Sequence, residues 1–277
     1  MPAFMTGQNF EAYLTDHKKK KGIVLTCRVH PGESNAQFIM EGMIEFLLSK
    51  DREAQQLRNQ YVFKIVPMLN PDGVVYGNYR CSLLGVDLNR RWINPSKVLH
   101  PTIYHMKQLL KMFDVERKVE LYTDVHGHSR SKNAFMYGCT VNALDPHSNK
   151  SNATIKALPY FIGQRNKLFR FNQCNFAVER EKEATARIVL FRELSLMQSF
   201  TLEVSFYGGE ALSKGPSGFV GEEEEDEAEE EEEEEEEYGQ ETQTELSKRV
   251  RSDAEEERVI KLHCMKQPPS IDTARPG

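Results

Sequence analysis

The chain has 277 residues, of which 28% are charged and 39% hydrophobic, enough for one α/β domain with a sizeable core and a further segment. Its five cysteines are widely spaced and include no CxxC pair, which argues against a disulfide framework and indicates reduced thiols in the cytoplasm. The N-terminus lacks a basic-then-apolar leader pattern, and no apolar run approaches the length of a membrane span, so neither a secreted nor a membrane protein is expected.

The net charge of −6 is the average of two unlike segments. Residues 222–237 hold 15 acidic side chains and no lysine or arginine, and repulsion at that density prevents a packed fold. Residues 1–221 hold 29 basic and 20 acidic side chains, a net charge of +9 that attracts anionic partners without choosing among them. We predict a folded domain over residues 1–215 and an acidic, largely disordered tail over 216–277.

The first third of the chain alternates strand and helix patterns. An apolar run predicts a buried strand over residues 22–28. Apolar side chains then recur on one helical face, and we expect Ser34 or Asn35 to lie near the N-cap of that helix. A second strand is predicted over residues 61–69, followed by a turn at residues 70–73, whose sequence is Asn-Pro-Asp-Gly.

The same alternation continues after this turn. Pro101 is placed to begin a helix, and residues 153–170 form another helical pattern. Strands are predicted over residues 119–125, 134–139 and 199–206. Strands that alternate with helices predict an α/β fold with a mixed, mostly parallel sheet and helices on both faces. Functional sites in such sheets collect at the carboxyl ends of the strands.

Candidate metal ligands follow two of these predicted strands. His30 and Glu33 lie directly after the first strand, in HPGES, and a pair at this spacing can reach one metal ion. His126 and His128 end the third strand, in DVHGHS. Catalytic zinc requires three protein ligands and one open position. Taken singly, each histidine also fits a surface, cap or turn role.

A carboxylate and a basic cluster are candidates for catalysis and substrate binding. Glu203 interrupts an apolar strand, and a carboxylate there either acts as a base with a raised pKa or points to solvent from an edge strand. Arg80, Asn89 and Arg90 lie near two turns, and arginine binds a carboxylate through two parallel hydrogen bonds. An ordinary surface position is the alternative for either arginine.

Five motifs occur in an order that resembles a known family. HPGES, NPDGVVYGNYR, DLNRRW, DVHGHSR and TLEVSFYGGE together resemble the zinc carboxypeptidase superfamily, and within it the cytosolic carboxypeptidases that deglutamylate proteins. The resemblance covers about residues 5–210. It implies that His30, Glu33 and His126 bind one Zn²⁺ ion, so that His126 rather than His128 is the ligand.

The resemblance also implies roles for the remaining candidates. Arg80 matches the arginine that polarises the scissile carbonyl, and Asn89 and Arg90 match the pair that binds the terminal carboxylate. Glu203 matches the general base, which takes a proton from water and returns it to the leaving amine. Arg187 falls at the expected floor of the side-chain pocket, where a cation favours a terminal glutamate. An exposed loop position is the alternative for Arg187.

These implications predict a zinc-dependent metallocarboxypeptidase that hydrolyses C-terminal or side-chain-linked glutamates. The expected partners are acidic peptides or protein tails such as that of tubulin, with no nucleic acid or membrane partner. A monomer in the cytoplasm, associated with microtubules or cilia, is expected.

Departures from the family pattern leave alternatives open. The resemblance predicts a fold shortened at both ends, and Ala184 and Ala186 stand where glycines are expected. One alternative is a catalytically impaired module that binds polyglutamate, and another is a zinc deacylase of small amino-acid conjugates. The acidic run 222–237 is expected to be a solvated tail, the alternative being that it folds over the basic cleft and competes with substrate.

Overall fold

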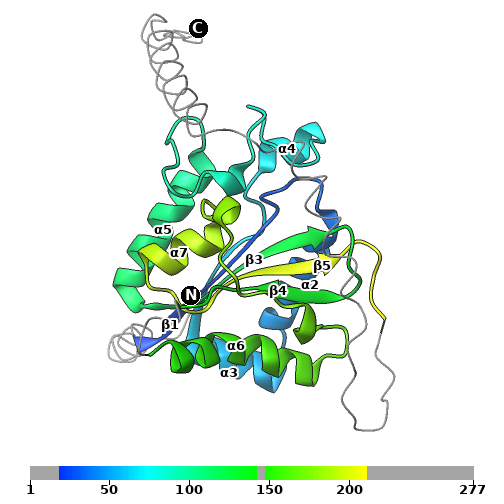
Figure 1. Ribbon diagram of the computed structural model, residues 1–277, viewed down its shortest axis with the longest axis vertical. Helices are drawn as coiled ribbons and strands as arrows, with labels where there is room; N and C mark the ends of the chain where they lie inside the picture. Colours follow the sequence, from blue (N-terminus) through cyan, green and yellow to red (C-terminus); the bar gives the residue numbers. More distant parts are fainter. Residues whose placement is uncertain (1–18, 142–146, 211–277) are drawn as a thin grey trace, which may run out of the picture. The chain divides into compact units, whose positions relative to one another are not determined.

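The computed structural model describes residues 19–141 and 147–210 (Figure 1). The predicted tail, 216–277, lies outside the described residues, so the tail and its boundary with the folded domain stay predictions. No helix in these two ranges is both long enough and apolar enough to cross a membrane.

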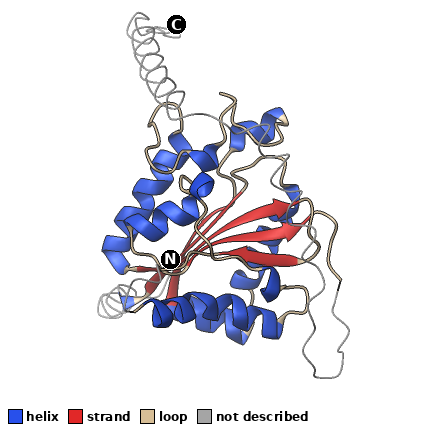
Figure 2. Cartoon of the chain, viewed as in Figure 1, coloured by secondary structure: helices blue, strands red, loops and turns tan. Residues whose placement is uncertain are grey.

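The described residues form one five-stranded sheet with the strand order β2-β1-β3-β5-β4 (Figures 1 and 2). Three adjacent pairs are parallel, and β4 pairs antiparallel with β5 at one edge. The bounds are β1 Lys21–Cys27, β2 Tyr61–Val66, β3 Val119–His128, β4 Ala134–Tyr137 and β5 Ser199–Ser205. The predicted mixed, mostly parallel sheet is confirmed.

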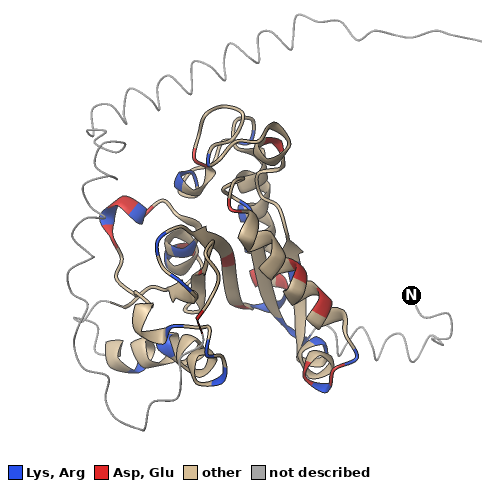
Figure 3. Cartoon of the chain, turned by 90° about the vertical axis from the view of Figure 1, so that its right-hand side faces the viewer, with Lys and Arg blue, Asp and Glu red and all other residues tan. Residues whose placement is uncertain are grey.

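Helices cover both faces of this sheet (Figure 1). One face packs against α5 (Pro101–Arg117) and α7 (Ala186–Glu193). The opposite face packs against α2 (Ser34–Leu48), α3 (Arg52–Gln60) and α6 (Ser148–Arg165). Because parallel strands are buried on both sides, β1 reads as a nearly continuous apolar run. Charged residues accordingly lie mostly on helices and loops, while the strands are largely uncharged (Figure 3).

The starts of two helices refine the predictions. Helix α2 begins at Ser34, near the expected cap, and its N-cap is Glu33, whose side chain makes no capping bond. The turn predicted at residues 70–73 is the start of a further helix, α4 (Pro71–Tyr76). Asn70 caps it by accepting a hydrogen bond from Gly73 N, which is how Asn and Pro begin a helix as well as a turn.

Helix α6 begins and ends five residues earlier than predicted. The residues beyond its end pair with the edge of the sheet instead of continuing the helix. Ala134 N donates to Leu168 O, and Arg170 N donates to Ala134 O. This pairing with β4 gives backbone N–H and C=O groups after α6 the hydrogen-bond partners that a longer helix would have provided.

Candidate metal centre

The candidate ligands lie where β1 and β3 end side by side. After β1 the chain turns through residues 28–33 into α2, with Arg28 in the left-handed region at a φ of 56°. The segment after β2 holds this turn in place, because Leu69 N donates to Cys27 O and Asn70 N to Arg28 O. His30 and Glu33 therefore face the end of the neighbouring strand, β3.

His30, Glu33 and His126 converge on one point. Each offers a ligand atom within 4.8 Å of the other two, and all three side chains are buried. His30 Nδ1 lies 2.7 Å from Glu33 Oε1, and His126 Nδ1 lies 3.1 Å from Glu33 Oε2. The two imidazole centroids are 5.0 Å apart. Two imidazoles and one carboxylate in this arrangement are a donor set that suits catalytic zinc.

The second nitrogen of each imidazole has its own carboxylate partner. His30 Nε2 lies 3.2 Å from Asp87 Oδ1, and His126 Nε2 lies 2.9 Å from Asp124 Oδ2. Such partners fix the orientation of a metal-binding imidazole and leave the nitrogen facing the metal without its proton. Glu33 is oriented in turn by Gly127 N, which donates to Oε2 at 2.9 Å.

A chain of hydrogen bonds continues inward from Asp124. Thr26 Oγ1 donates to Asp124 Oδ1 at 2.7 Å and lies 2.8 Å from the Tyr122 hydroxyl. All of these side chains are buried on the face that α5 and α7 cover. Thr26 and Asp124 are paired in the register of β1 and β3. This pairing places the Thr26 hydroxyl beside the Asp124 carboxylate and so fixes the orientation of the carboxylate.

The electrostatics of the cluster suit a cation. Burial opposes the charged form of His126, yet Asp124 and Glu33 raise its pKa well above the ordinary value. Burial likewise opposes ionisation of Glu33, but the two imidazoles outweigh it and lower the pKa of that carboxyl. The negative potential that stabilises a proton on His126 would also stabilise a divalent ion. The residues present therefore fit one zinc ion.

Glu203 lies beside this cluster. It is in direct register with His126 on the neighbouring parallel strand, so both side chains leave the same face of the sheet. Strand β5 lies between β3 and β4, so the alternative of an edge strand is wrong. Burial raises the pKa of Glu203 to about 7, while His126 opposes that rise. Within the described residues no hydrogen bond or ion pair engages its carboxylate, which leaves it available to a reacting group.

The basic candidates surround Asp87. Arg80 Nε and Nη2 lie 3.0 and 2.9 Å from Asp87 Oδ2, and Arg90 Nη1 lies 3.9 Å from the same oxygen. Asn89 is buried, and its Oδ1 accepts from Ala186 N at 3.1 Å. The two arginine side chains and the backbone N–H of Asn89 are thus linked through Asp87 to His30. That they bind substrate stays a prediction.

Arg187 lies in the first turn of α7 and is 3% exposed, so it is not the exposed loop residue of the alternative. Its Nη1 donates to Gly138 O and lies 3.7 Å from Cys139 Sγ. Its guanidinium carbon lies 5.8 Å from the centroid of the Tyr137 ring. The structure fixes this cation at the end of β4, and its contact with substrate stays a prediction.

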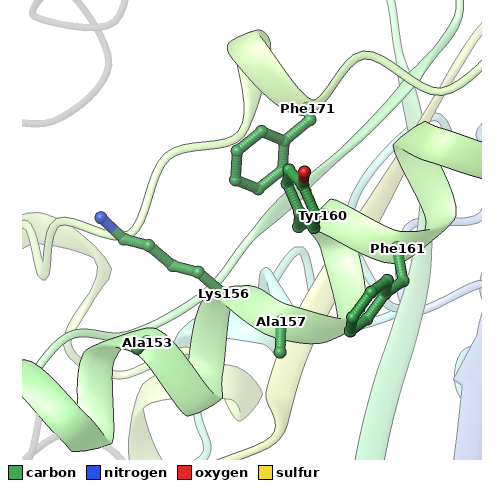
Figure 4. Close-up of a pocket in the computed structure, with 6 residues that line it drawn as sticks. All are labelled: Ala153, Lys156, Ala157, Tyr160, Phe161 and Phe171. Carbon is green, nitrogen blue, oxygen red and sulfur yellow. The ribbon is translucent and has the colours of Figure 1, made fainter.

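Two other features do not join the cluster. His128 Nδ1 accepts hydrogen bonds from Arg130 N and Ser131 N at 3.2 and 3.0 Å, which is the role of a turn histidine. A shallow hollow lies on the outer side of α6 and η2 (Phe171–Gln173) (Figure 4). It is lined by Ala153, Lys156, Ala157, Tyr160, Phe161 and Phe171. This lining offers a single ionisable cation and a phenol, and it contains no metal ligand.

Sequence reasoning missed Asp87 and Asp124 as functional residues. Asp124 stands two residues before His126 in a strand, a spacing that puts both side chains on one face. This spacing alone is enough to indicate Asp124 as a neighbour of His126. Asp87 is 57 residues from His30, and only the fold brings the two together.

The chain is similar to characterised proteins over most of its length. The model of the zinc carboxypeptidase family matches residues 5–254. Over 213 residues the chain is 46% identical to cytosolic carboxypeptidase 1 of Xenopus laevis, which covers 74% of this chain and 17% of that protein. It is 45% identical over 214 residues to the human protein of the same name, with the same coverage. The chain thus spans less than a fifth of the length of these two relatives.

Solved structures share the fold. The metallo-carboxypeptidase of Burkholderia cenocepacia superposes with a TM-score of 0.59 at 26% identity, covering 68% of this chain and 48% of that one. A metallo-carboxypeptidase of Pseudomonas aeruginosa gives a TM-score of 0.58 at 27% identity, covering 68% and 49%.

Proposed function

The chain belongs to the zinc carboxypeptidase family, and on that premise we propose that it is a zinc metallocarboxypeptidase that removes glutamate from acidic protein tails. The observation that carries this proposal is Glu203, a carboxylate without a partner among the described residues, in register with His126 and beside the buried His30–Glu33–His126 cluster. A base at this position is what hydrolysis requires in addition to a metal site.

His30, Glu33 and His126 would hold the ion. When bound, zinc supplies Lewis acidity, which lowers the pKa of water and polarises a carbonyl group. Glu203 takes a proton from the attacking water and returns it to the leaving amine. Its pKa of about 7, raised mainly by burial, suits a group that must both accept and donate a proton near neutral pH.

The basic side chains hold and orient the substrate. Asn89 and Arg90 bind the terminal carboxylate, and Arg80 stabilises the negative charge that develops on the scissile carbonyl oxygen. Arg187 binds the carboxylate of the terminal side chain, which selects glutamate and disfavours lysine or arginine. The net positive charge of residues 1–221 raises the local concentration of acidic tails.

The substrate class and location follow from the same premise. Polyglutamylated tubulin is the kind of acidic tail proposed, and the names of the relatives support a cytoplasmic protein. Association with microtubules or cilia is the corresponding location.

One observation favours a second candidate, a module that binds polyglutamate without cutting it. Two nitrogens of Arg80 contact Asp87, so this carboxylate competes with a substrate carbonyl for the guanidinium group. The side chain of Arg80 is 44% exposed.

The test separates the two candidates. The purified full chain, supplied with zinc, is incubated with peptides that end in glutamate or in lysine, and the released amino acid is quantified. We expect glutamate release by wild type and none by Glu203→Gln. Binding of the glutamate peptide by wild type without release would favour the binding module. Absence of both release and bound zinc would reject the peptidase, and absence of peptide binding as well would reject both candidates.

A further inference from the structure

Lys107 is a buried lysine in the middle of α5, with 5% of its surface exposed. Its ammonium group has three partners, because Nζ donates to Trp92 O, Ile93 O and Glu193 Oε1, each at 2.7 Å. A buried charge is tolerated only where it is paired and fully hydrogen-bonded. An ammonium whose three protons are all used holds its partners in one arrangement.

These partners belong to the two segments that carry the proposed substrate contacts. Trp92 and Ile93 follow η1 (Leu88–Arg90), which contains Asn89 and Arg90. Glu193 is the last residue of α7, whose first turn contains Arg187. Lys107 thus connects the segment that would bind the terminal carboxylate with the helix that would bind the side-chain carboxylate.

The two segments are also joined at the other end of α7. Trp92 N donates to Ala184 O at 3.2 Å, and Ala186 N donates to Asn89 Oδ1 at 3.1 Å. A helix is stiff and rises about 1.5 Å per residue, so two anchored ends determine where every side chain between them lies. The position of Arg187 relative to Asn89 therefore depends on the anchor that Lys107 provides.

We propose that Lys107 is a positioning residue that sets the spacing between the Asn89–Arg90 segment and Arg187, and thereby lets the site distinguish a terminal glutamate from a terminal aspartate. This inference rests on the proposed function. The two carboxylates of a terminal glutamate are separated by one more methylene than those of aspartate. When the two cationic contacts are held at a fixed spacing, a terminal glutamate can reach both of them, whereas a terminal aspartate can reach only one.

The surface neighbour Lys111 provides a matched control. Its Nζ lies 3.0 Å from Glu193 Oε2, and its side chain is 44% exposed. Lys111 thus contacts the same carboxylate as Lys107, and no hydrogen bond to Trp92 or Ile93 is recorded for it among the described residues. Removing Lys111 changes the charge near Glu193 and leaves both backbone carbonyls with their donor.

The experiment compares Lys107→Met with Lys111→Met in the full chain. The readout is the ratio of kcat/KM for two peptides that differ only in a terminal glutamate or aspartate. We expect Lys107→Met to lower this ratio about 10-fold, mainly through a higher KM for the glutamate peptide, since one methylene is worth about 10- to 200-fold in a well-held site. Lys111→Met should change the ratio less than about twofold, as for other exposed ion pairs. Zinc content should be unchanged in both.

Glu193→Ala is the second variant, because loss of Lys107 leaves two buried carbonyls without a donor and can prevent folding. The side chain of Glu193 is 34% exposed. Its removal leaves both carbonyls with their donor, Lys107, and releases α7 from that donor. A glutamate-to-aspartate ratio that stays at the wild-type value in both variants would overturn the inference alone.

A binding assay keeps the inference testable if the wild type releases no glutamate, which would refute the proposed function. In that case the ratio of dissociation constants for the two peptides is measured in a Glu203→Gln background. An unchanged ratio on adding Lys107→Met, or binding of neither peptide, also refutes the inference.

Discussion

The two faces of the central sheet differ in what their side chains do. On β3, Tyr122, Asp124 and His126 point toward α5 and α7 and form hydrogen bonds. The alternate residue Val125 points toward α2 and packs in an apolar core. Neighbouring residues of one strand thus contribute separately to the candidate site and to stability. We therefore expect a substitution of one such residue to have little effect on the role of the next.

Four buried side chains of the polar face are held together by contacts with one another. Thr26, Asp124, His126 and Glu33 form an unbroken series of contacts between 2.7 and 3.1 Å. Buried polar groups are tolerated when each has a partner, and one broken link leaves its neighbour unsatisfied. Substitutions in this series of contacts should therefore affect metal binding and catalysis, and substitutions in the apolar core beneath α2 should affect the free energy of unfolding.

Glu203→Gln should have the largest effect on the polar face. Because Gln cannot take a proton from water, kcat should fall about 10²- to 10⁴-fold, the usual contribution of a general base. Zinc content should remain at the wild-type value, since Glu203 is not among the three converging ligands. The comparison is made by steady-state kinetics together with metal analysis. A variant with wild-type kcat would remove Glu203 from the proposed reaction.

Phe200→Ala tests the apolar face of the same strand. Phe200 is fully buried in the core beneath α2 and α6, and such truncations cost about 3–5 kcal/mol in the free energy of unfolding. Urea denaturation measures that loss, and zinc titration of the still-folded protein should give an unchanged dissociation constant. A zinc affinity that falls in parallel with stability would show that the two faces are not separable.

Asp124→Asn should have a smaller effect, which is confined to the affinity for zinc. Loss of the charge beside His126 Nε2 should weaken zinc binding about 10- to 100-fold, as for other partners of metal-binding imidazoles. Competition with a chelator measures the dissociation constant. Thr26→Val, one hydrogen bond further from the ligand, should weaken zinc binding less than Asp124→Asn. The reverse order would contradict the proposed series of contacts.

Local patterns allowed the sheet to be predicted, and they indicated His30, Glu33, His126 and His128 as candidate metal ligands because these residues follow or end apolar strands. The family resemblance, not the local pattern, chose His126 over His128. Local patterns failed where a distant segment decides the outcome. Residues 166–170 read as helix and pair with β4 instead. Nothing in the local sequence distinguishes Lys107 from other helix residues, since its partner Glu193 is 86 positions away. Glu33 is both the N-cap of α2 and a candidate ligand, and the sequence does not show which role directs its side chain.

The zinc content of the purified, folded chain tests the central claim most directly, with two variants of β3 measured in parallel. We expect one zinc ion per chain in wild type and in His128→Ala, because His128 accepts hydrogen bonds in a turn. His126→Ala should lose the ion, since it removes one of three converging ligands. Zinc retained by His126→Ala, or lost from His128→Ala alone, would contradict the assignment of the metal centre.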